Sequence, residues 1–188
     1  MANEIYTSRL ILRPIAVTDA PELHAIRSQE EVYRHIWTGP WKSISETEEW
    51  IQEIRNGPRS IMYTILQKEE TTIIGIVGVN RWDKVHYMID PKFWNRGYAT
   101  EALAAFLVAF FKLQPKRLCI QTLLSAENHA SRKVLEKCGF VHDAPKPYPG
   151  PPTTSEPSEE EEMEAISGAG SNPAPSDSTL YFIYIKPT

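Results

Sequence analysis

The stretch 89–102 most constrains how this 188-residue chain can fold, because it combines the end of a strand, a tight turn and the start of a helix. Residues 85–89 are rich in apolar side chains, and Asp90-Pro91 ends that run because proline supplies no ladder donor. From residue 99 onward, apolar side chains recur at the three- and four-residue spacing of a helix. The sequence therefore predicts a strand, a turn and a helix, with Gly97 at the junction.

Gly97 also predicts an anion site. A glycine lets backbone N–H groups approach a ligand closely, and the first turn of a helix leaves unpaired donors and a partial positive charge. The nearby cations Lys92 and Arg96 favour the same interpretation. A plain turn is the alternative that these residues alone leave open.

Further strands are indicated by short runs rich in β-branched and apolar residues. They cover residues 7–15, 61–66, 72–79, 118–123, 140–142 and 180–185. The polar residues 67–70 between the second and third runs predict a hairpin, and Gly75 and Gly78 predict a bulge or close packing there.

Helix starts are indicated by two capping boxes, Asp19 with Glu22 and Ser45 with Glu48. Gly57-Pro58 should end the second of these helices.

Two more helices follow the turn. Pro115 closes the first, and the next, predicted over 125–137, is ended by Gly139. The strand at 118–123 lies between these helices, so the strand, helix and strand around Gly97 predict a parallel, right-handed crossover.

Residues 145–178 have a different composition, with eight prolines, seven acids and one base. Such a segment buries too little apolar surface to offset its ordering entropy, so we expect disorder. The strongly β run 180–185 follows it, so the segment is predicted to be an insertion between two strands. The predicted organisation is one domain made of residues 1–144 and 179–188.

Composition excludes several classes of protein. The chain is long enough for one core and has no run of apolar residues that could span a bilayer or act as a secretory signal, so a cytoplasmic protein without membrane contact is expected. Cys119 and Cys138 lack metal-type spacing and should be packed, reduced thiols. Without the acidic insertion the net charge of −4 becomes +2, which suits a phosphorylated ligand but not nucleic acid.

Two motifs in order, residues 94–102 and 128–140, resemble those of the GNAT superfamily of N-acetyltransferases. The opening Thr7–Arg13 is similar to that of the RimJ/RimL-type branch. The resemblance implies an α/β fold of the mixed α+β kind. Its twisted, mostly antiparallel sheet would have about seven strands, with a V-shaped splay between two parallel central strands and about four helices around it.

The resemblance also implies an acetyl-CoA site, with no metal. The pyrophosphate would rest on backbone N–H groups at the helix start, the pantetheine arm would lie beside the strand before it, and the thiol end would face the second motif. The cofactor-binding residues carried over in this way are Met88, Ile89, Trp94, Asn95, Arg96, Gly97, Tyr98, Ala99, Thr100, Asn128 and Ser131. Trp94 stands where the usual signature has Gln or Arg.

Acetyl transfer from a thioester to an amine also needs a base and a proton donor. Many relatives place a tyrosine where this chain has Leu135, so Ser131 is the candidate acid, unless its hydroxyl only bonds its own helix. Relatives with a glutamate base align it with Lys84. Period 2 puts Lys84, His86 and Met88 on one face, which makes His86 the candidate base, with a packing histidine as the alternative.

The acceptor is predicted less directly. A site without a carboxylate base favours an α-amino group over lysine, because the lysine amine is harder to deprotonate. Trp37, Trp41 and His86 are the candidate acceptor-binding residues. The expected function is acetylation of a protein or peptide α-amine by direct attack in a ternary complex, by a monomer or homodimer. A small-amine acetyltransferase and a silent acyl-CoA-binding module are the alternatives.

The acidic insertion can be tested directly. A solvated spacer should be dispensable, so deletion of 146–177 is expected to leave the KM of every accepted amine unchanged. An acidic flap over the acceptor would instead be revealed by a KM that rises for cationic amines in the deletion variant.

Overall fold

The computed structural model describes residues 3–36, 38–143 and 179–187. Trp37 and the insertion 145–178 lie outside the described residues, so the predictions made for them stay predictions. No helix among the described residues is long and apolar enough to cross a membrane.

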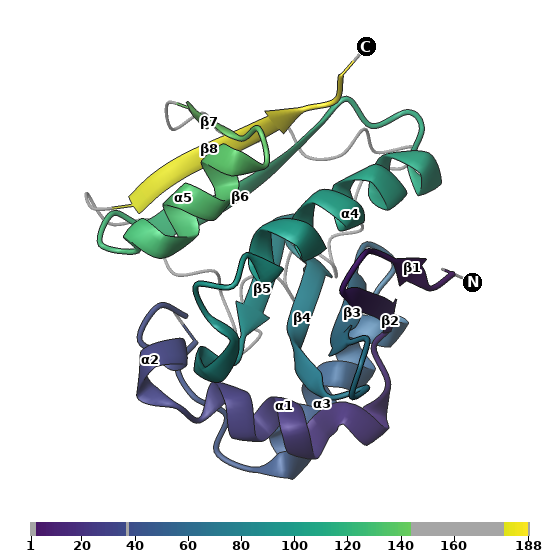
Figure 1. Ribbon diagram of the computed structural model, residues 1–188, viewed down its shortest axis with the longest axis vertical. Helices are drawn as coiled ribbons and strands as arrows, with labels where there is room; N and C mark the ends of the chain where they lie inside the picture. The colour runs from purple at the N-terminus through teal and green to yellow at the C-terminus, as the bar shows by residue number, and fades with distance from the viewer. Residues whose placement is uncertain (1–2, 37, 144–178, 188) are drawn as a thin grey trace, which may run out of the picture.

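Two sheets form the centre of the molecule (Figure 1). The larger sheet is antiparallel, in the order β1-β2-β3-β4-β5, and the smaller has the order β6-β8-β7. The strands of the larger sheet are β1 (Ile5–Tyr6), β2 (Leu10–Pro14), β3 (Ile61–Gln67), β4 (Ile73–Val79) and β5 (Val85–Ile89). Those of the smaller sheet are β6 (Cys119–Ser125), β7 (Val141–Asp143) and β8 (Thr179–Ile185).

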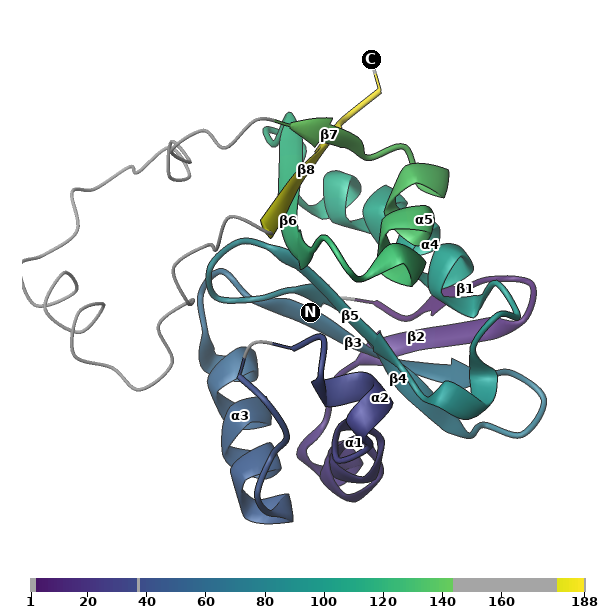
Figure 2. The ribbon, with the colours of Figure 1, turned by 90° about the vertical axis from the view of Figure 1, so that its left-hand side faces the viewer.

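Five α-helices and two short 3-10 helices surround these sheets in the described part of the chain. The α-helices are α1 (Ala20–Arg27), α2 (Glu30–Tyr33), α3 (Ile44–Asn56), α4 (Tyr98–Leu113) and α5 (His129–Lys137). The 3-10 helices are η1 (Val17–Asp19) and η2 (Pro91–Phe93). Figure 2 shows α1 to α3 against one face of the larger sheet and α4 with α5 on the other side.

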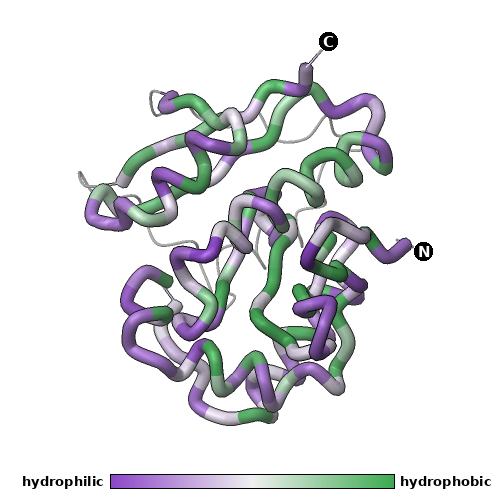
Figure 3. The backbone as a smooth tube through the Cα atoms, in the orientation of Figure 1, coloured by the Kyte–Doolittle hydropathy of each residue, from purple (hydrophilic) through white to green (hydrophobic). Residues whose placement is uncertain are grey.

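Hydrophobic side chains form a separate core on each face of the larger sheet. One core joins β2 to β5 with α4 and the smaller sheet, and includes Phe106, Phe110 and Phe182. The other packs Met62, Ile76 and Met88 against α1 and α3. Figure 3 shows hydrophobic residues along the central strands and α4, and mainly hydrophilic ones around the outer loops. The strands are therefore apolar on both faces.

The predicted strand pattern is confirmed. The hairpin is β3-β4, and the last strand returns to the sheet because β8 pairs with β6 on one side and β7 on the other. The first run is divided, since residues 7–9 turn between β1 and β2. The described residues hold eight strands where about seven were expected, and α2 adds a helix that the sequence pattern did not indicate.

Both predicted capping boxes are wrong. The Asp19 carboxylate makes no cap to α1 and instead accepts hydrogen bonds from Arg13 and from the Thr64 hydroxyl at 2.6 Å. Helix α3 begins two residues earlier than expected, because Ser43 accepts a hydrogen bond from the Glu46 N–H at 3.1 Å. Asp19 is thus taken up by an ion pair with Arg13, and Ser43 caps α3 in place of Ser45.

The glycines of β4 permit a close approach between strands. A Cβ added at Gly75 would lie 1.9 Å from the Met88 carbonyl oxygen on β5, and one at Gly78 would lie 2.1 Å from the Ile61 carbonyl oxygen on β3. The predicted close packing is confirmed, and it keeps β5 pressed onto the sheet.

Gly75→Ala is expected to lower the free energy of unfolding by about 1–3 kcal/mol, because backbone has to shift to admit the methyl group. Gly39→Ala is the matched control. Gly39 has φ +68 but no atom within 4 Å of an added Cβ, so it should lose only about 1 kcal/mol. Equal losses in denaturant unfolding would contradict the steric explanation.

Candidate active site

The site begins where β5 and β6 part. The two strands share one parallel bridge, Lys84 with Gln121, reinforced by a 2.8 Å hydrogen bond from Lys84 Nζ to Gln121 Oε1. One residue further along, the Thr122 hydroxyl donates to the Val85 carbonyl at 2.9 Å. Among the described residues, no bridge joins the two strands beyond this point. The two sheets therefore diverge toward the C-terminal end of β5.

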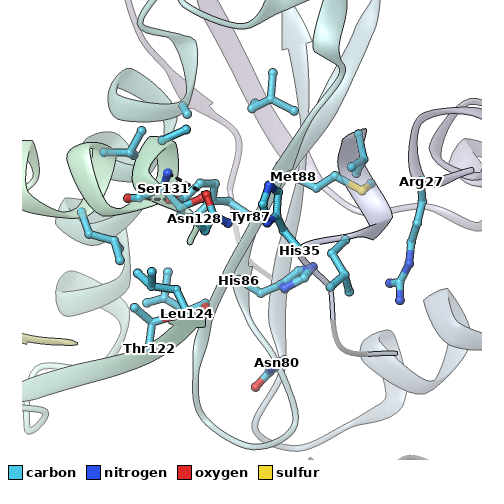
Figure 4. A pocket seen from close by; sticks show the side chains of 18 of the residues that line it. Arg27, His35, Asn80, His86, Tyr87, Met88, Thr122, Leu124, Asn128 and Ser131 are labelled. Atoms are coloured by element: carbon cyan, nitrogen blue, oxygen red, sulfur yellow. Dashed lines mark hydrogen bonds between the residues drawn. The ribbon is translucent and has the colours of Figure 1, made fainter. Parts of the chain in front are cut away.

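A groove of about 870 Å³ occupies the space between them. Its walls come from α2, α3, β5, the turn before α4, β6 and α5. Figure 4 shows the groove with Asn128 and Ser131 on one side and His86 and Arg27 toward the other. Segments far apart in the sequence thus meet at one cavity.

Side chains of β5 alternate between the two cores, as the period-2 prediction requires. Val85, Tyr87 and Ile89 join the core under α4, whereas Met88 belongs to the core under α1 and α3. His86, on the Met88 face, lines the groove. Backbone groups alternate too: the Val85 carbonyl points to β6, so the amide and carbonyl of Tyr87 face the side where the strands have parted.

The turn before α4 is built from two residues in the left-handed region, Asn95 with φ +59 and Gly97 with φ +80. Gly97 is the N-cap residue, and the first helical hydrogen bond runs from the Glu101 N–H to its carbonyl at 3.0 Å. The amides of Tyr98, Ala99 and Thr100 consequently have no intrahelical acceptor. With the helix dipole behind them, they form a positively polarised helix start that lines the groove, which is the kind of site where anions bind in proteins.

The remaining predicted cofactor-binding residues near this turn do not all line the groove. The Trp94 indole donates to the Ile89 carbonyl at 2.7 Å and fastens the turn to the end of β5. Arg96 does not line the groove; its guanidinium lies over the Phe93 ring, 5.6 Å from the ring centroid. Met88, Ile89, Trp94, Asn95 and Gly97 to Thr100 all line it.

Residues 7–9 clamp the first turn of α4 through one carboxylate. Glu101 accepts hydrogen bonds from the Thr7 hydroxyl at 2.6 Å, the Ser8 hydroxyl at 3.0 Å and Arg9 Nε at 2.7 Å. Arg9 Nη1 also donates to the Arg96 carbonyl at 2.9 Å. Burial alone would raise the pKa of Glu101, but these hydrogen bonds outweigh it and lower the pKa. The clamp explains physically what the Thr-x-Arg opening does.

The second motif forms the opposite wall. Asn128 caps α5 by accepting from the Ser131 N–H at 3.0 Å. The Ser131 hydroxyl makes no hydrogen bond within the described residues, so the alternative that it bonds its own helix is not seen. Leu135 is buried in the core. The Tyr87 hydroxyl, whose pKa burial raises, donates to the Ser131 carbonyl at 3.2 Å.

Two histidines lie in the middle of the groove (Figure 4). Burial, followed by the positive charge of Arg27, lowers the pKa of His86 to about 4. His35, at the end of α2, has its pKa lowered by burial and then by Arg34, with Glu127 opposing. Both rings are neutral at pH 7. His35 follows a segment without helical periodicity, so no pattern in the sequence indicates that it lines the groove.

The aromatic side chains on the acceptor side pack mainly against each other. Trp41 is buried, 4.9 Å from Trp50 between ring centroids, and the Arg27 guanidinium lies 4.3 Å from its ring. Trp41, Trp50 and Trp82 all line the groove. Trp37 lies outside the described residues.

Cys119 and Cys138 are unpaired thiols that lie partly buried. Burial raises the pKa of Cys138 to about 11, so this thiol is unreactive at neutral pH. No cluster of three His, Cys, Asp or Glu side chains suited to a metal ion occurs in the described ranges.

The fold and the groove are those of an acetyltransferase, the class that the family comparison assigns. Residues 9–141 match the family model of the acetyltransferase (GNAT) domain, which covers more than half of the chain, so the chain belongs to this family. It is an N-acetyltransferase, as the resemblance predicted.

Relatives agree with this assignment. The uncharacterized N-acetyltransferase YoaA of Bacillus subtilis (strain 168) is 30% identical over 144 residues, covering 71% of this chain and 80% of that protein. The uncharacterized N-acetyltransferase p20 of Bacillus licheniformis is 28% identical over 146 residues, covering 72% and 81%.

Solved structures share the fold. The ribosomal L7/L12 α-N-protein acetyltransferase RimL, in complex with coenzyme A, superposes with a TM-score of 0.71 at 16% identity, covering 97% of this chain and 98% of that one. The spermidine N-acetyltransferase of Vibrio cholerae, in complex with CoA and spermine, gives 0.66 at 19% identity, covering 73% and 84%.

Glu101→Ala is expected to loosen the turn before α4, lowering the free energy of unfolding by about 1.5–3 kcal/mol and raising the KM for acetyl-CoA several-fold. Because the pKa of Glu101 is lowered in the folded state, the ionised carboxylate contributes its full stabilisation at pH values above the ordinary pKa of a glutamate. That stabilisation is lost as the pH falls through the pKa of Glu101 in the folded state. The matched control is Glu136→Ala, which removes an exposed pair with Arg132 and should change stability by less than about 1 kcal/mol. An unchanged KM in Glu101→Ala would contradict the clamp.

Proposed function

We propose that this enzyme, as a RimJ/RimL-like acetyltransferase, transfers the acetyl group of acetyl-CoA to the α-amino group of a protein or peptide by direct attack in a ternary complex. The observation that carries the proposal is the chemistry of the β5 face. This face offers the neutral imidazole of His86 to an incoming amine, with His35 beside it from the end of the α2 segment. Lys84 stands at the position where relatives with a glutamate base carry it.

The donor end of the groove suits acetyl-CoA, which supplies the acetyl group as a thioester. The residues that would hold the pyrophosphate are the amides from Asn95 to Thr100, at the start of a 16-residue helix. Lys133 and Lys137 line the same groove and add positive charge. The exposed backbone edge of β5 would pair with the amides of the pantetheine arm, and Asn128 and Ser131 would face its thiol end.

The acceptor class follows from how weak the available bases are. An imidazole with a pKa of about 4 cannot hold a proton taken from a lysine ammonium, which has an ordinary pKa of about 10.4. An α-amino group has a pKa of about 7.8, so much of it is already neutral near pH 7.5. The difference favours the α-amine by roughly 3.5 kcal/mol. His86 then has to accept a proton only as the nitrogen attacks.

Proton return to the leaving thiolate is assigned to Ser131, directly or through a water molecule. Its hydroxyl is uncommitted among the described residues and lies on the wall opposite His86 (Figure 4). Tyr87 holds the carbonyl of the same residue, which fixes the first turn of α5 against β5.

The test is a panel of acceptors at varied pH, with CoA release as the readout. We expect peptides with a free α-amine to be acetylated faster than spermidine or N-terminally blocked lysine peptides. We expect kcat/KM to rise with pH and level off above about 8, as the α-amine deprotonates. His86→Gln should lower kcat without moving this limb, because the His86 pKa lies far below it. Faster turnover of spermidine than of every peptide would overturn the assignment.

A further inference from the structure

Arg27 is a buried cation with no carboxylate beside it among the described residues. It lies at the end of α1, is 4% exposed and forms no ion pair there. Its Nε donates to the Gly39 carbonyl at 2.9 Å, and its Nη2 donates to the Thr38 hydroxyl. Its Nη1 has no hydrogen-bond partner within the described ranges. The guanidinium therefore has N–H donors that no group among the described residues binds.

Buried charges in proteins are normally paired, because desolvation is costly. Burial lowers the pKa of Arg27 to about 10, so the group stays charged at pH 7. Glu46 acts on it only from a distance, and the Glu46 carboxylate accepts the Lys42 N–H at 2.6 Å. Among the described residues, Arg27 is thus a buried cation that no carboxylate reaches at ion-pair distance, and Glu46 attracts it only from further away.

The orientation of this cation is fixed toward the groove. The guanidinium lies over the Trp41 ring, 4.3 Å from its centroid, and is held by the two hydrogen bonds to residues 38–39. It lines the groove on the same side as His86, close enough for its charge to act on that imidazole (Figure 4). A planar fork with open donors at this place matches a carboxylate.

We propose that Arg27 binds a carboxylate of the acceptor, so that the preferred acceptor carries an acidic group close to its reactive amine. Two sources share this chemistry: the side chain of an acidic residue near a peptide N-terminus, and the α-carboxylate of a free amino acid. The inference rests on the proposed function and specifies one further property of the acceptor, a negative charge close to its amine.

Glutamates at the rim do not reverse this preference. Among the described residues, Glu31, Glu49, Glu53 and Glu127 line the groove and are exposed, and Glu53 lies 3.8 Å from Arg81. Glu46 also lines it and is partly buried, but its carboxylate is bound to the Lys42 N–H and forms no ion pair with Arg27. Exposed charges are screened by water and salt, whereas a desolvated charge acts at full strength on a ligand that reaches it. Arg27 should therefore dominate recognition next to the amine.

The experiment compares matched acceptors that differ only in one carboxylate. One arm uses peptide amides that begin Ser-Glu or Ser-Gln, and the other uses an amino acid and its amide. Rates are expressed per concentration of unprotonated amine, so that the amine pKa does not enter. The wild-type enzyme should favour the carboxylate in at least one arm by about tenfold or more in kcat/KM, and that arm identifies the source.

Variants assign this preference to Arg27. Arg27→Gln should bring the ratio to about one, mainly through KM, and Arg27→Lys should keep part of it. Arg27→Lys also retains the buried charge, so it reports on recognition if Arg27→Gln is unfolded. Arg55→Gln, at an exposed position of α3 outside the groove, should keep the wild-type ratio.

Two results would overturn the inference: a wild-type enzyme that uses both members of each pair equally, or an Arg27→Gln variant that folds and keeps the preference. Efficient acetylation of the uncharged Ser-Gln peptide would at the same time support the proposed function. A preference for spermidine over all α-amines would instead reject the proposed function itself.

Discussion

The parting of β5 and β6 beyond Lys84 and Gln121 is the constraint on which the rest of the structure depends. In the part of the chain that the structure describes, one bridge joins the strands there, and the edge of β5 that follows has no neighbouring strand. Unpaired backbone groups need hydrogen-bond partners, and an extended ligand with amide groups could supply them from within the groove. The splay is stable because each strand is paired on its other side, β5 with β4 and β6 with β8.

The two sides of this gap carry different polar and charged groups. On one side lie unpaired helix amides and lysines, which suit a phosphorylated donor. On the other lie imidazoles kept neutral by burial and one buried guanidinium. The thioester carbonyl and the amine would meet between them. Residues 7–9, through Glu101, hold the donor side in register with the sheet, so the first strands of the chain also serve the site.

Much of the fold was predictable because it rests on local patterns. The period-2 runs, the hairpin and the glycine-led helix at Gly97 all appear where the sequence places them. The failures came from tertiary competition: Asp19 was taken for a cap but is bound by Arg13 and Thr64, which lies 45 residues away along the chain. The groove-lining turn before α4 and the capped start of α5 also lie where the two motifs predict them. The positions of His35 and Arg27 in the groove, and the clamp of residues 7–9 on Glu101, could not be predicted in this way. They depend on which distant segments of the chain come together, and no local spacing of residues encodes that.

Hydrogen–deuterium exchange of the full chain, with and without coenzyme A, would locate the cofactor on the protein. We expect the ligand to lie on the amides at the start of α4 and along the open edge of β5. Saturating coenzyme A should therefore slow exchange in peptides covering residues 94–101 and 85–89, with little change in β1 to β3. Unchanged exchange at 94–101, with protection confined to α1 to α3, would contradict this placement.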